Sequence, residues 1–530
     1  MNKPALTSPL FKLWTKTYAF VMLCYSPFFI YFLWGNHDWG WIKENTPVWS
    51  GVFEGRFSQF FIPNLLFSGL ILPVLSNAFG LAAFTFATIL FLKLWNFPKK
   101  NFLAILLTVI TVTSSYTLSW FYFAFLTLSC LSWPLIIASA FYLLQKNKNT
   151  LLSATAATAL FTLALGGYPP IINMMGTILF MLLLADLCLY HFTLSELLRK
   201  YTPHIISILA AVSIFCFIQY LLKKTGLQQE TYNTAGIDLS TLPKQLKIGL
   251  TESLTQFTYT TSFITAPYKY LTLFLFMATL SYLFCSLKKN TLNILFFLLF
   301  LLALLLSSVF TTIIAQNTNY VWQEPRIKFF TLPYITLFSA AMLLQSKNKT
   351  FTNIVYATLL LLISNNLITN CYAAKIWLLG FKAEADYSER FISRLEEQKN
   401  FNPTDKQYTF IQSGTISFRP KYAVHTNNDR TDSYTLTAPY IPWHLPYKAY
   451  TFYYPYTFIN QDFDVYWKTV HPAYINMTDK LADYLTQDSQ PWPHRNAVYF
   501  SEDLIILTQS ADGKKSGENW FYNYFTGYPH

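Results

Sequence analysis

A histidine and an aspartate stand side by side at positions 37 and 38, directly after the first apolar run of the chain. An acidic side chain at the mouth of a membrane bundle is energetically costly unless it has a function. A carboxylate can accept the proton of an attacking hydroxyl group. We therefore predict Asp38, with His37 beside it, as the chemical centre. The alternative is structural: Asp38 caps a surface helix that begins near Trp39.

Further charged residues occur at two places. Glu54 and Arg56 close the loop that contains Asp38, and Glu324, Arg326 and Lys328 precede a late apolar run. Charges at the mouth of a span either anchor it in the interface or hold an anionic ligand. These five side chains are therefore candidates for substrate binding.

A glycine- and proline-rich motif, Gly166-Gly167-Tyr168-Pro169-Pro170, joins two apolar runs. Glycine and proline break helices where the backbone turns close to another group. We predict Tyr168 as a substrate-binding residue, and the alternative is a plain turn between two helices.

The elements that must position these residues are membrane spans. The chain has 530 residues, of which 53% are hydrophobic and 12% charged, and this charged share is about half that of soluble domains. A span needs about 20 mostly apolar residues. We therefore predict a polytopic α-helical membrane protein with eleven spans near residues 17–34, 79–97, 102–119, 121–144, 151–167, 171–191, 203–222, 268–286, 291–314, 328–345 and 351–371.

The segment Phe60–Leu75 is apolar but short and contains two prolines. If it lies in the interface without crossing, five basic pairs fall on the side of the N-terminus, as the bias of Lys and Arg towards cytoplasmic loops requires. We therefore predict a cytoplasmic N-terminus and an external first loop, residues 35–78, with interfacial helices. The pair Lys223/Lys224 is left outside without an explanation. The five pairs are Lys99/Lys100, Lys146/Lys148, Arg199/Lys200, Lys288/Lys289 and Lys347/Lys349.

The composition becomes polar near residue 374, which divides the chain into a transmembrane domain, residues 1–373, and an external α+β domain, residues 374–530. In the second domain we predict a helix over 383–399 and strands over 408–412 and 497–508. The aromatic segment 440–456 is interpreted either as a sugar-stacking surface or as a face that docks on the membrane domain.

Other activities lack their motifs. The sequence has no phosphate-binding glycine loop, no GxSxG elbow and no HExxH motif, and its histidines and six cysteines lack ligand spacing,. We therefore predict no metal site and no disulfide framework. The net charge of +12 comes mostly from the basic loop pairs, so nucleic acid is not an expected partner.

The order of the motifs resembles a known family. A cytoplasmic N-terminus, a long first loop that opens with an acid, interfacial helices that end near Phe79-Gly80 and a late Glu-Pro-Arg look like the membrane glycosyltransferases of GT-C type. Within that type the chain is similar, over about residues 15–415, to the serotype-converting O-antigen glucosyltransferases of bacteria and their phages. The motifs are NHDW (36–39), EGR (54–56), GGYPP (166–170), QEPR (323–326) and the run 365–395.

This resemblance implies transfer of a hexose, glucose in that family, from a polyprenyl-phosphate donor in the membrane to a polysaccharide outside the bacterial inner membrane. Asp38 would then be the general base, and Arg326 and Arg56 would stabilise the leaving phosphate, with Lys328 in reserve. The family usually has paired acids in the first loop, whereas His37 precedes Asp38 here. The first loop thus lacks the paired acids that would support a divalent cation. The need for a cation stays open.

Two other functions are compatible with a polytopic chain. A flippase of lipid-linked sugars would show inverted repeats and charges at the midplane of the membrane, whereas the charges here gather at the mouth. A non-catalytic assembly protein would act through its external domain. Convergence of Asp38 and Arg326 on one cavity would favour the enzyme.

Overall fold

The chain divides into two compact units, Met1–Tyr372 and Ala373–His530. The computed structural model describes residues 9–30, 45–97, 101–121, 124–146, 150–228, 241–258, 264–288, 290–314, 325–401, 408–413, 467–469, 494–500 and 504–508.

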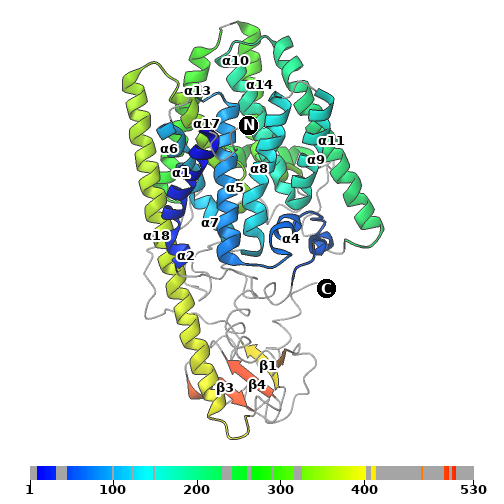
Figure 1. Ribbon diagram of the computed structural model, residues 1–530, viewed down its shortest axis with the longest axis vertical. Helices are drawn as coiled ribbons and strands as arrows, with labels where there is room; N and C mark the ends of the chain where they lie inside the picture. The colour runs from blue at the N-terminus through cyan, green and yellow to red at the C-terminus, as the bar shows by residue number, and fades with distance from the viewer. Residues whose placement is uncertain are drawn as a thin grey trace, which may run out of the picture. The chain divides into compact units, whose positions relative to one another are not determined.

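The first unit consists of helices, the last of which continues past Tyr372 into the second unit (Figure 1). Those described are α1 (Pro9–Cys24), α2 (Ser26–Ile30), η2 (Ser50–Glu54), α4 (Phe61–Phe67), α5 (Pro73–Leu94), α6 (Asn101–Val112), α7 (Ser115–Phe121), α8 (Ala124–Lys146), α9 (Thr150–Gly167), η3 (Pro169–Ile171), α10 (Ile172–Cys188), α11 (Leu194–Lys224), α12 (Leu242–Thr255), α13 (Ala266–Ser286), α14 (Thr291–Ser308), α15 (Phe310–Ile314), α16 (Pro325–Lys328), α17 (Leu332–Leu343) and α18 (Lys349–Glu396).

Each of the eleven predicted spans contains a helix. Within the described residues, seven helices are long and apolar enough to cross a membrane, and an eighth span results if α6 and α7, bent by 53°, are taken together. Two further apolar helices, α9 and α17, are shorter. The prediction of a polytopic helical membrane protein is therefore confirmed in its class, and the number of eleven spans stays a prediction.

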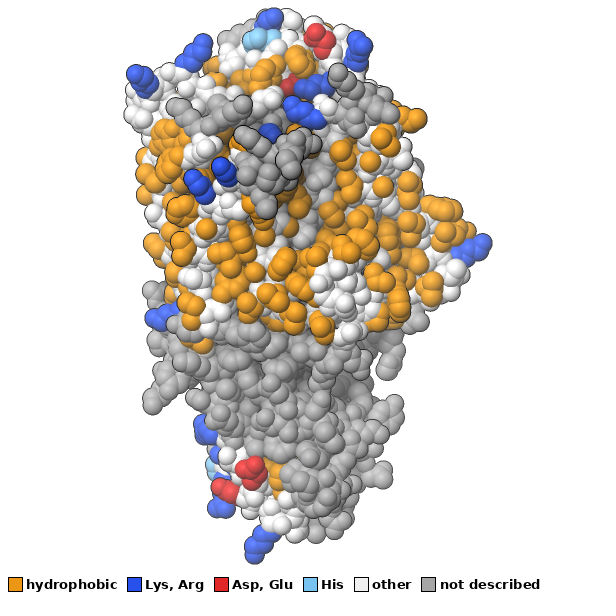
Figure 2. Space-filling model, viewed as in Figure 1, with side chains coloured by type: hydrophobic (Ala, Val, Ile, Leu, Met, Phe, Trp, Pro, Cys, Tyr) orange, Lys and Arg blue, Asp and Glu red, His pale blue; other side chains and the backbone are white. Residues whose placement is uncertain are grey.

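The exterior of the helical unit is apolar, and Figure 2 shows apolar side chains over a broad band of it. The spanning helices differ in burial: 83% of the apolar window around α10 is buried, against 11% for α11. The central α10 is therefore surrounded by protein, and α11 presents most of its surface outward, as a lipid-facing helix does. Exposed side chains of the band include Leu65, Ile206, Leu209, Phe217, Leu298, Leu361 and Ile368.

The first loop differs from its prediction in two respects. Helix α4 has seven residues, too few to cross a bilayer, in agreement with a segment that does not span. However, α5 begins at Pro73, so the loop ends before residue 78. Proline suits the first turn of a helix because its missing N–H group has no partner there. Phe79-Gly80 consequently lies inside α5, and the expected turn at this dipeptide is wrong.

The last predicted span and the helix predicted over 383–399 are parts of one helix, α18, which has 48 residues. The break expected between them is therefore wrong. In the second unit, the described strands are β1 (Tyr408–Ser413), β2 (Trp467–Thr469), β3 (Val498–Phe500) and β4 (Leu504–Thr508), and η8 (Arg495–Ala497) comes directly before β3.

The four strands form one sheet in the order β2-β1-β4-β3. Strand β1 is parallel to β2 and β4, and β3 is antiparallel to β4. The single strand predicted over 497–508 is therefore two strands, and β2 was not predicted. The aromatic segment 440–456 lies outside the described residues.

Candidate functional site

The predicted site residues fall into two groups. Glu54, Arg56, Tyr168 and Lys328 lie in the described part of the chain. His37, Asp38 and Glu324 lie outside it, as does the side chain of Arg326, whose backbone belongs to α16. The structure therefore does not test whether Asp38 and Arg326 converge, and their roles stay predictions.

Arg56 follows a glycine that ends η2 in the left-handed conformation. Gly55 has φ 75°, a value that glycine adopts without steric cost. Its carbonyl accepts a hydrogen bond from the Gln219 amide of α11. The turn is closed by a hydrogen bond of 2.7 Å from the Arg56 amide to the Gly51 carbonyl. Arg56 also forms an ion pair of 2.9 Å with Glu54, and both side chains are half-buried.

The same segment docks on the GGYPP motif. The Ser58 amide donates to the Gly166 carbonyl over 3.1 Å, and the Ser58 hydroxyl donates to the Leu163 carbonyl over 2.5 Å. A Cβ atom on Gly166 would lie 2.3 Å from the Phe57 ring, and one on Gly167 would lie 2.1 Å from Trp133. The glycines are therefore required for close approach, and the motif is more than a plain turn.

Arg56 and Tyr168 meet at this contact. The guanidinium carbon lies 5.4 Å from the centroid of the Tyr168 ring, within the range of a cation–π interaction. The ring is 7% exposed and packs against Trp120 and Phe330, with centroids 5.2 and 5.6 Å away. Through Tyr168, the first loop is thus linked to the segment that follows Lys328.

Lys328 is buried and faces a carboxylate that the sequence analysis missed. Its ammonium nitrogen lies 3.9 Å from Oε1 of Glu252, which belongs to α12. The two residues are each 5% exposed. Taking two charges out of water is costly, and their mutual attraction offsets that cost only in part. A pair of this kind is more often found at functional sites than elsewhere.

The protonation of this pair is set mainly by burial. Burial raises the pKa of Glu252 to about 7, although the nearby Lys328 ammonium acts in the opposite direction. Glu252 therefore helps Lys328 to keep its positive charge in a dry environment.

Glu252 could have been found from the sequence. It lies on α12. Two residues that are four apart in a helix lie on the same face. Gln256 follows Glu252 by four residues. The missed signal was a polar helix face, Gln245, Glu252 and Gln256, which is buried while the leucines of the opposite face, such as Leu250 and Leu254, are exposed.

Lys223 and Lys224 occupy the last turn of α11. A positive charge there is favourable because it faces the negative end of the helix dipole. This local reason for the two lysines holds on either side of the membrane, and their position outside stays a prediction.

Within the described residues, no group of three or more His, Cys, Asp or Glu side chains is placed to hold a metal ion. Comparison with known proteins gave one family. The family described as Glucosyl transferase GtrII matches residues 42–344, a range that contains Arg56, Tyr168, Glu252 and Lys328 and begins after Asp38. No curated protein and no solved structure matches the chain. Because the matched range is more than half of the 530 residues, the chain belongs to the Glucosyl transferase GtrII family.

Proposed function

We propose that this chain moves glucose from a polyprenyl-phosphate donor to a hydroxyl group of a cell-surface polysaccharide such as O-antigen, on the external face of the bacterial inner membrane. Its family supports glycosyltransferase activity, a sugar donor and a polysaccharide acceptor. The family does not favour a flippase of lipid-linked sugars. The lipid donor, the external face and the residue roles belong to the proposal.

One observation carries the proposal. Arg56, from the first loop, stacks on Tyr168 of the GGYPP motif, and Tyr168 packs on Phe330, two residues after Lys328. The EGR and GGYPP motifs and the segment that follows Lys328, which are far apart in the sequence, therefore meet at one place in a unit of apolar helices. A cationic place of this kind suits a lipid phosphate that reaches the site from the bilayer.

In the proposed reaction, the acceptor oxygen attacks the anomeric carbon of the donor, and its proton passes to Asp38. The bond between that carbon and the phosphate oxygen breaks, and the polyprenyl phosphate leaves with the electron pair. Arg326 and Arg56 stabilise the leaving phosphate with paired N–H donors. Glu54 holds the Arg56 guanidinium in place through the ion pair.

Glu324 and Tyr168 would complete the binding site. Lys328 stands two residues after Arg326 in the chain, and its charge adds to the positive potential at this place. Glu252, whose carboxylate oxygen lies 3.9 Å from the Lys328 ammonium, is thus an indirect contributor.

The test is a transfer assay with purified protein in lipid vesicles. Radiolabelled polyprenyl-phosphate glucose and nucleotide-linked glucose are offered in parallel, with purified O-antigen polysaccharide as acceptor. We expect label in the polysaccharide from the lipid donor alone. Transfer from the nucleotide sugar at an equal rate would overturn the proposed donor. Movement of the lipid-linked sugar across the vesicle without transfer would favour the flippase.

A further inference from the structure

Helix α12 turns its polar side chains inward and its leucines outward. Glu252 and Gln256 are 5% and 1% exposed, whereas Leu250 and Leu254 are 42% and 66% exposed. Leu246 is also exposed and precedes Leu250 by four residues, so the three leucines form one row along the helix, here called the leucine row. A surface helix of a soluble protein shows the opposite arrangement, with its apolar side against the core. The leucine row is therefore suited to an apolar environment outside the protein.

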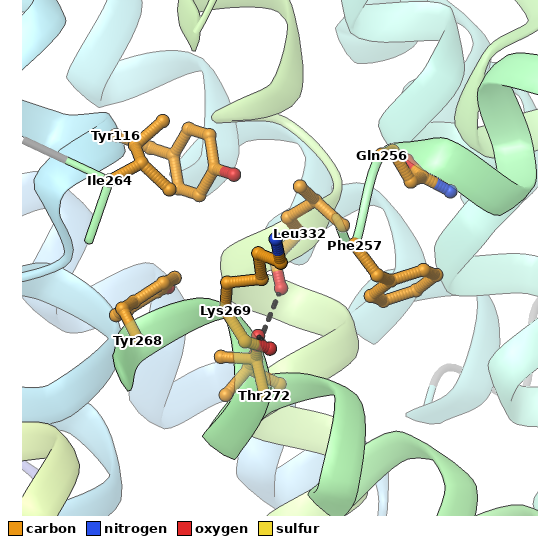
Figure 3. A pocket seen from close by; sticks show the side chains of 9 residues that line it. Tyr116, Gln256, Phe257, Ile264, Tyr268, Lys269, Thr272 and Leu332 are labelled. Carbon is orange, nitrogen blue, oxygen red and sulfur yellow. Dashed lines mark hydrogen bonds between the residues drawn. The ribbon is translucent and has the colours of Figure 1, made fainter. Parts of the chain in front are cut away.

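Contacts on the inward face fix this orientation of the helix. A Cβ atom on Gly249 would lie 2.4 Å from the Ile313 side chain of α15, so the two helices approach each other closely there. The side-chain amide of Gln256 donates to the Ser308 hydroxyl over 2.9 Å. Figure 3 shows Gln256 and Phe257, at the C-terminal end of α12, in the wall of a small pocket between the helices. Rotation of α12 about its axis would break these contacts, so they keep the leucine row on the outside.

The same contacts place α12 at one end of a membrane span. Ser308 is the last residue of α14, a helix long and apolar enough to cross a membrane, and only 17% of its apolar window is buried. The exposed side chains of α14 include Leu298 and Leu302, so this span presents leucines to lipid. With 14 residues, α12 is too short to cross a bilayer. It therefore lies beside the end of a lipid-facing span, at the level of the membrane–water interface.

Two lysines border the leucine row. Lys244 and Lys247 are both exposed on α12. Lys247 precedes Leu254 by seven residues, close to two turns of the helix, and therefore lies at the edge of the row. A lysine stem can lie along apolar surface while its ammonium reaches a polar layer. Exposed leucines with lysines at their border are typical of helices that lie in the membrane interface and face lipid phosphates with their cationic groups.

We propose that α12 is an interfacial helix, with the leucine row among the acyl chains of phospholipids and with Lys244 and Lys247 at their phosphate groups. A second copy of the chain would also cover leucines, but phospholipid matches both the lysines at the border and the lipid-facing α14 beside the helix. This position of α12 does not depend on the proposed reaction. Because α12 also carries Glu252, which faces Lys328 at 3.9 Å, lipid contact on one face of the helix holds that carboxylate in place on another.

Fluorescence quenching provides the first test. A bimane label is attached to Leu250→Cys, Leu254→Cys and, as the matched control, Thr255→Cys, in a chain whose six cysteines are replaced by alanine. Thr255 is exposed on the same helix, but it follows Leu250 by five residues and so points away from the leucine row. In vesicles, we expect nitroxide-bearing phospholipid to quench the labels at 250 and 254, and acrylamide in the water to quench the label at 255. Quenching of all three labels by acrylamide alone would overturn the proposal.

Photo-crosslinking tests the same surface in a chain that keeps its cysteines. Benzoylphenylalanine in place of Leu250 should form adducts with radiolabelled phospholipid under ultraviolet light, whereas in place of Thr255 it should form few. Adducts with a second copy of the chain or with another protein, instead of lipid adducts, would overturn the proposal. This measurement decides the question if the chain without cysteines does not fold.

The role of the two lysines is tested through the charge of the lipid. With the label at Leu254→Cys, vesicles of phosphatidylcholine alone are compared with vesicles that also contain anionic phosphatidylglycerol. Anionic lipid attracts lysines near the membrane surface, so phosphatidylglycerol should reduce the quenching by acrylamide, which is a neutral molecule. The variant Lys244→Gln/Lys247→Gln should lose this effect, whereas Lys288→Gln, an exposed lysine just before the opposite end of α14, should keep it. An equal effect of phosphatidylglycerol in all these proteins would exclude the phosphate contacts of Lys244 and Lys247.

Discussion

The guanidinium of Arg56 lies against the ring of Tyr168, 5.4 Å from its centroid, and Glu54 binds the same guanidinium at 2.9 Å. Arg56 is thus held from two sides while its side chain stays partly exposed. An arginine held in one orientation loses less entropy when it binds a phosphate than a free one does. The EGR and GGYPP motifs therefore form one unit in space, and Arg56 is the residue best placed to act in it.

The first prediction concerns Arg56→Lys. An ammonium keeps the charge, but it provides neither the paired donors nor the planar stack on Tyr168. We expect kcat to fall about 100-fold, with little change in melting temperature because Arg56 lies partly at the surface. The control is Lys223→Ala, which removes a charge at the exposed end of α11 and should leave transfer unchanged. Equal, mild losses in both variants would mean that Arg56 is only an interfacial anchor.

The second prediction concerns Gly166→Ala. The new Cβ would lie 2.3 Å from Phe57, so either the ring or the docked loop must move. Overpacking of this kind costs about 1–3 kcal/mol, and thermal unfolding in detergent should show it. The double variant Gly166→Ala/Phe57→Ala should be no less stable than Phe57→Ala alone, since the clashing ring is gone. If the stability losses of the two single variants simply add in the double variant, contact with the Phe57 ring is not what makes alanine unfavourable at position 166.

The spanning helices could be predicted because lipid imposes a simple requirement: about 20 apolar residues with all backbone groups bonded internally. The site was harder to predict. Arg56 and Tyr168 could each be named as candidates, but their contact depends on Gly166 and Gly167, whose missing side chains show only in three dimensions. Glu252 was overlooked, although it stands on a polar helix face, because its partner Lys328 is far away in the sequence. Local strand patterns likewise could not separate β3 from β4, which pair with each other.

The third prediction concerns the buried pair. Removing one member leaves the other charge buried without compensation, which typically costs about 3–5 kcal/mol. Lys328→Met and Glu252→Gln should therefore each lower the free energy of unfolding, whereas the double variant should recover most of that loss. Urea unfolding of the four proteins measures this directly. Losses that simply add would mean that the two side chains do not interact.

The same pair predicts a dependence of stability on pH. The pKa of Glu252 is raised from 4.5 to about 7 by burial, so between these values the folded state binds more protons than the unfolded state. The free energy of unfolding should therefore fall as pH rises from about 4.5 to about 7 and then level off. Glu252→Gln should remove this slope. A slope that persists unchanged in the variant would assign it to other groups.

The fourth prediction is topological. Reporters fused after Lys148 and after Lys289 should read cytoplasmic, and one fused after Asn400 should read external, because basic loop residues set the orientation of the spans. An external reading at Lys148 would reverse the whole assignment. It would also place the candidate site on the cytoplasmic side, where a polysaccharide at the cell surface is out of reach.

The last prediction concerns Asp38, which lies outside the described residues. As the general base it should be needed for turnover and not for folding. Asp38→Asn keeps the shape and the hydrogen bonding but removes the basicity, so we expect transfer to fall by about 100- to 10,000-fold, with normal expression and normal donor binding.

His37→Ala separates two roles of the neighbouring residue. If His37 only orients Asp38, the loss of transfer should be partial, whereas a loss as complete as that of Asp38→Asn would mean that the two side chains work as a unit. The structural alternative makes the opposite prediction for Asp38→Asn, because asparagine caps a helix as well as aspartate does. Transfer at the wild-type rate by Asp38→Asn would therefore exclude the catalytic role and leave the base to be sought elsewhere, first at Glu252. That carboxylate has its pKa raised to about 7, close to the value that suits a proton acceptor at neutral pH.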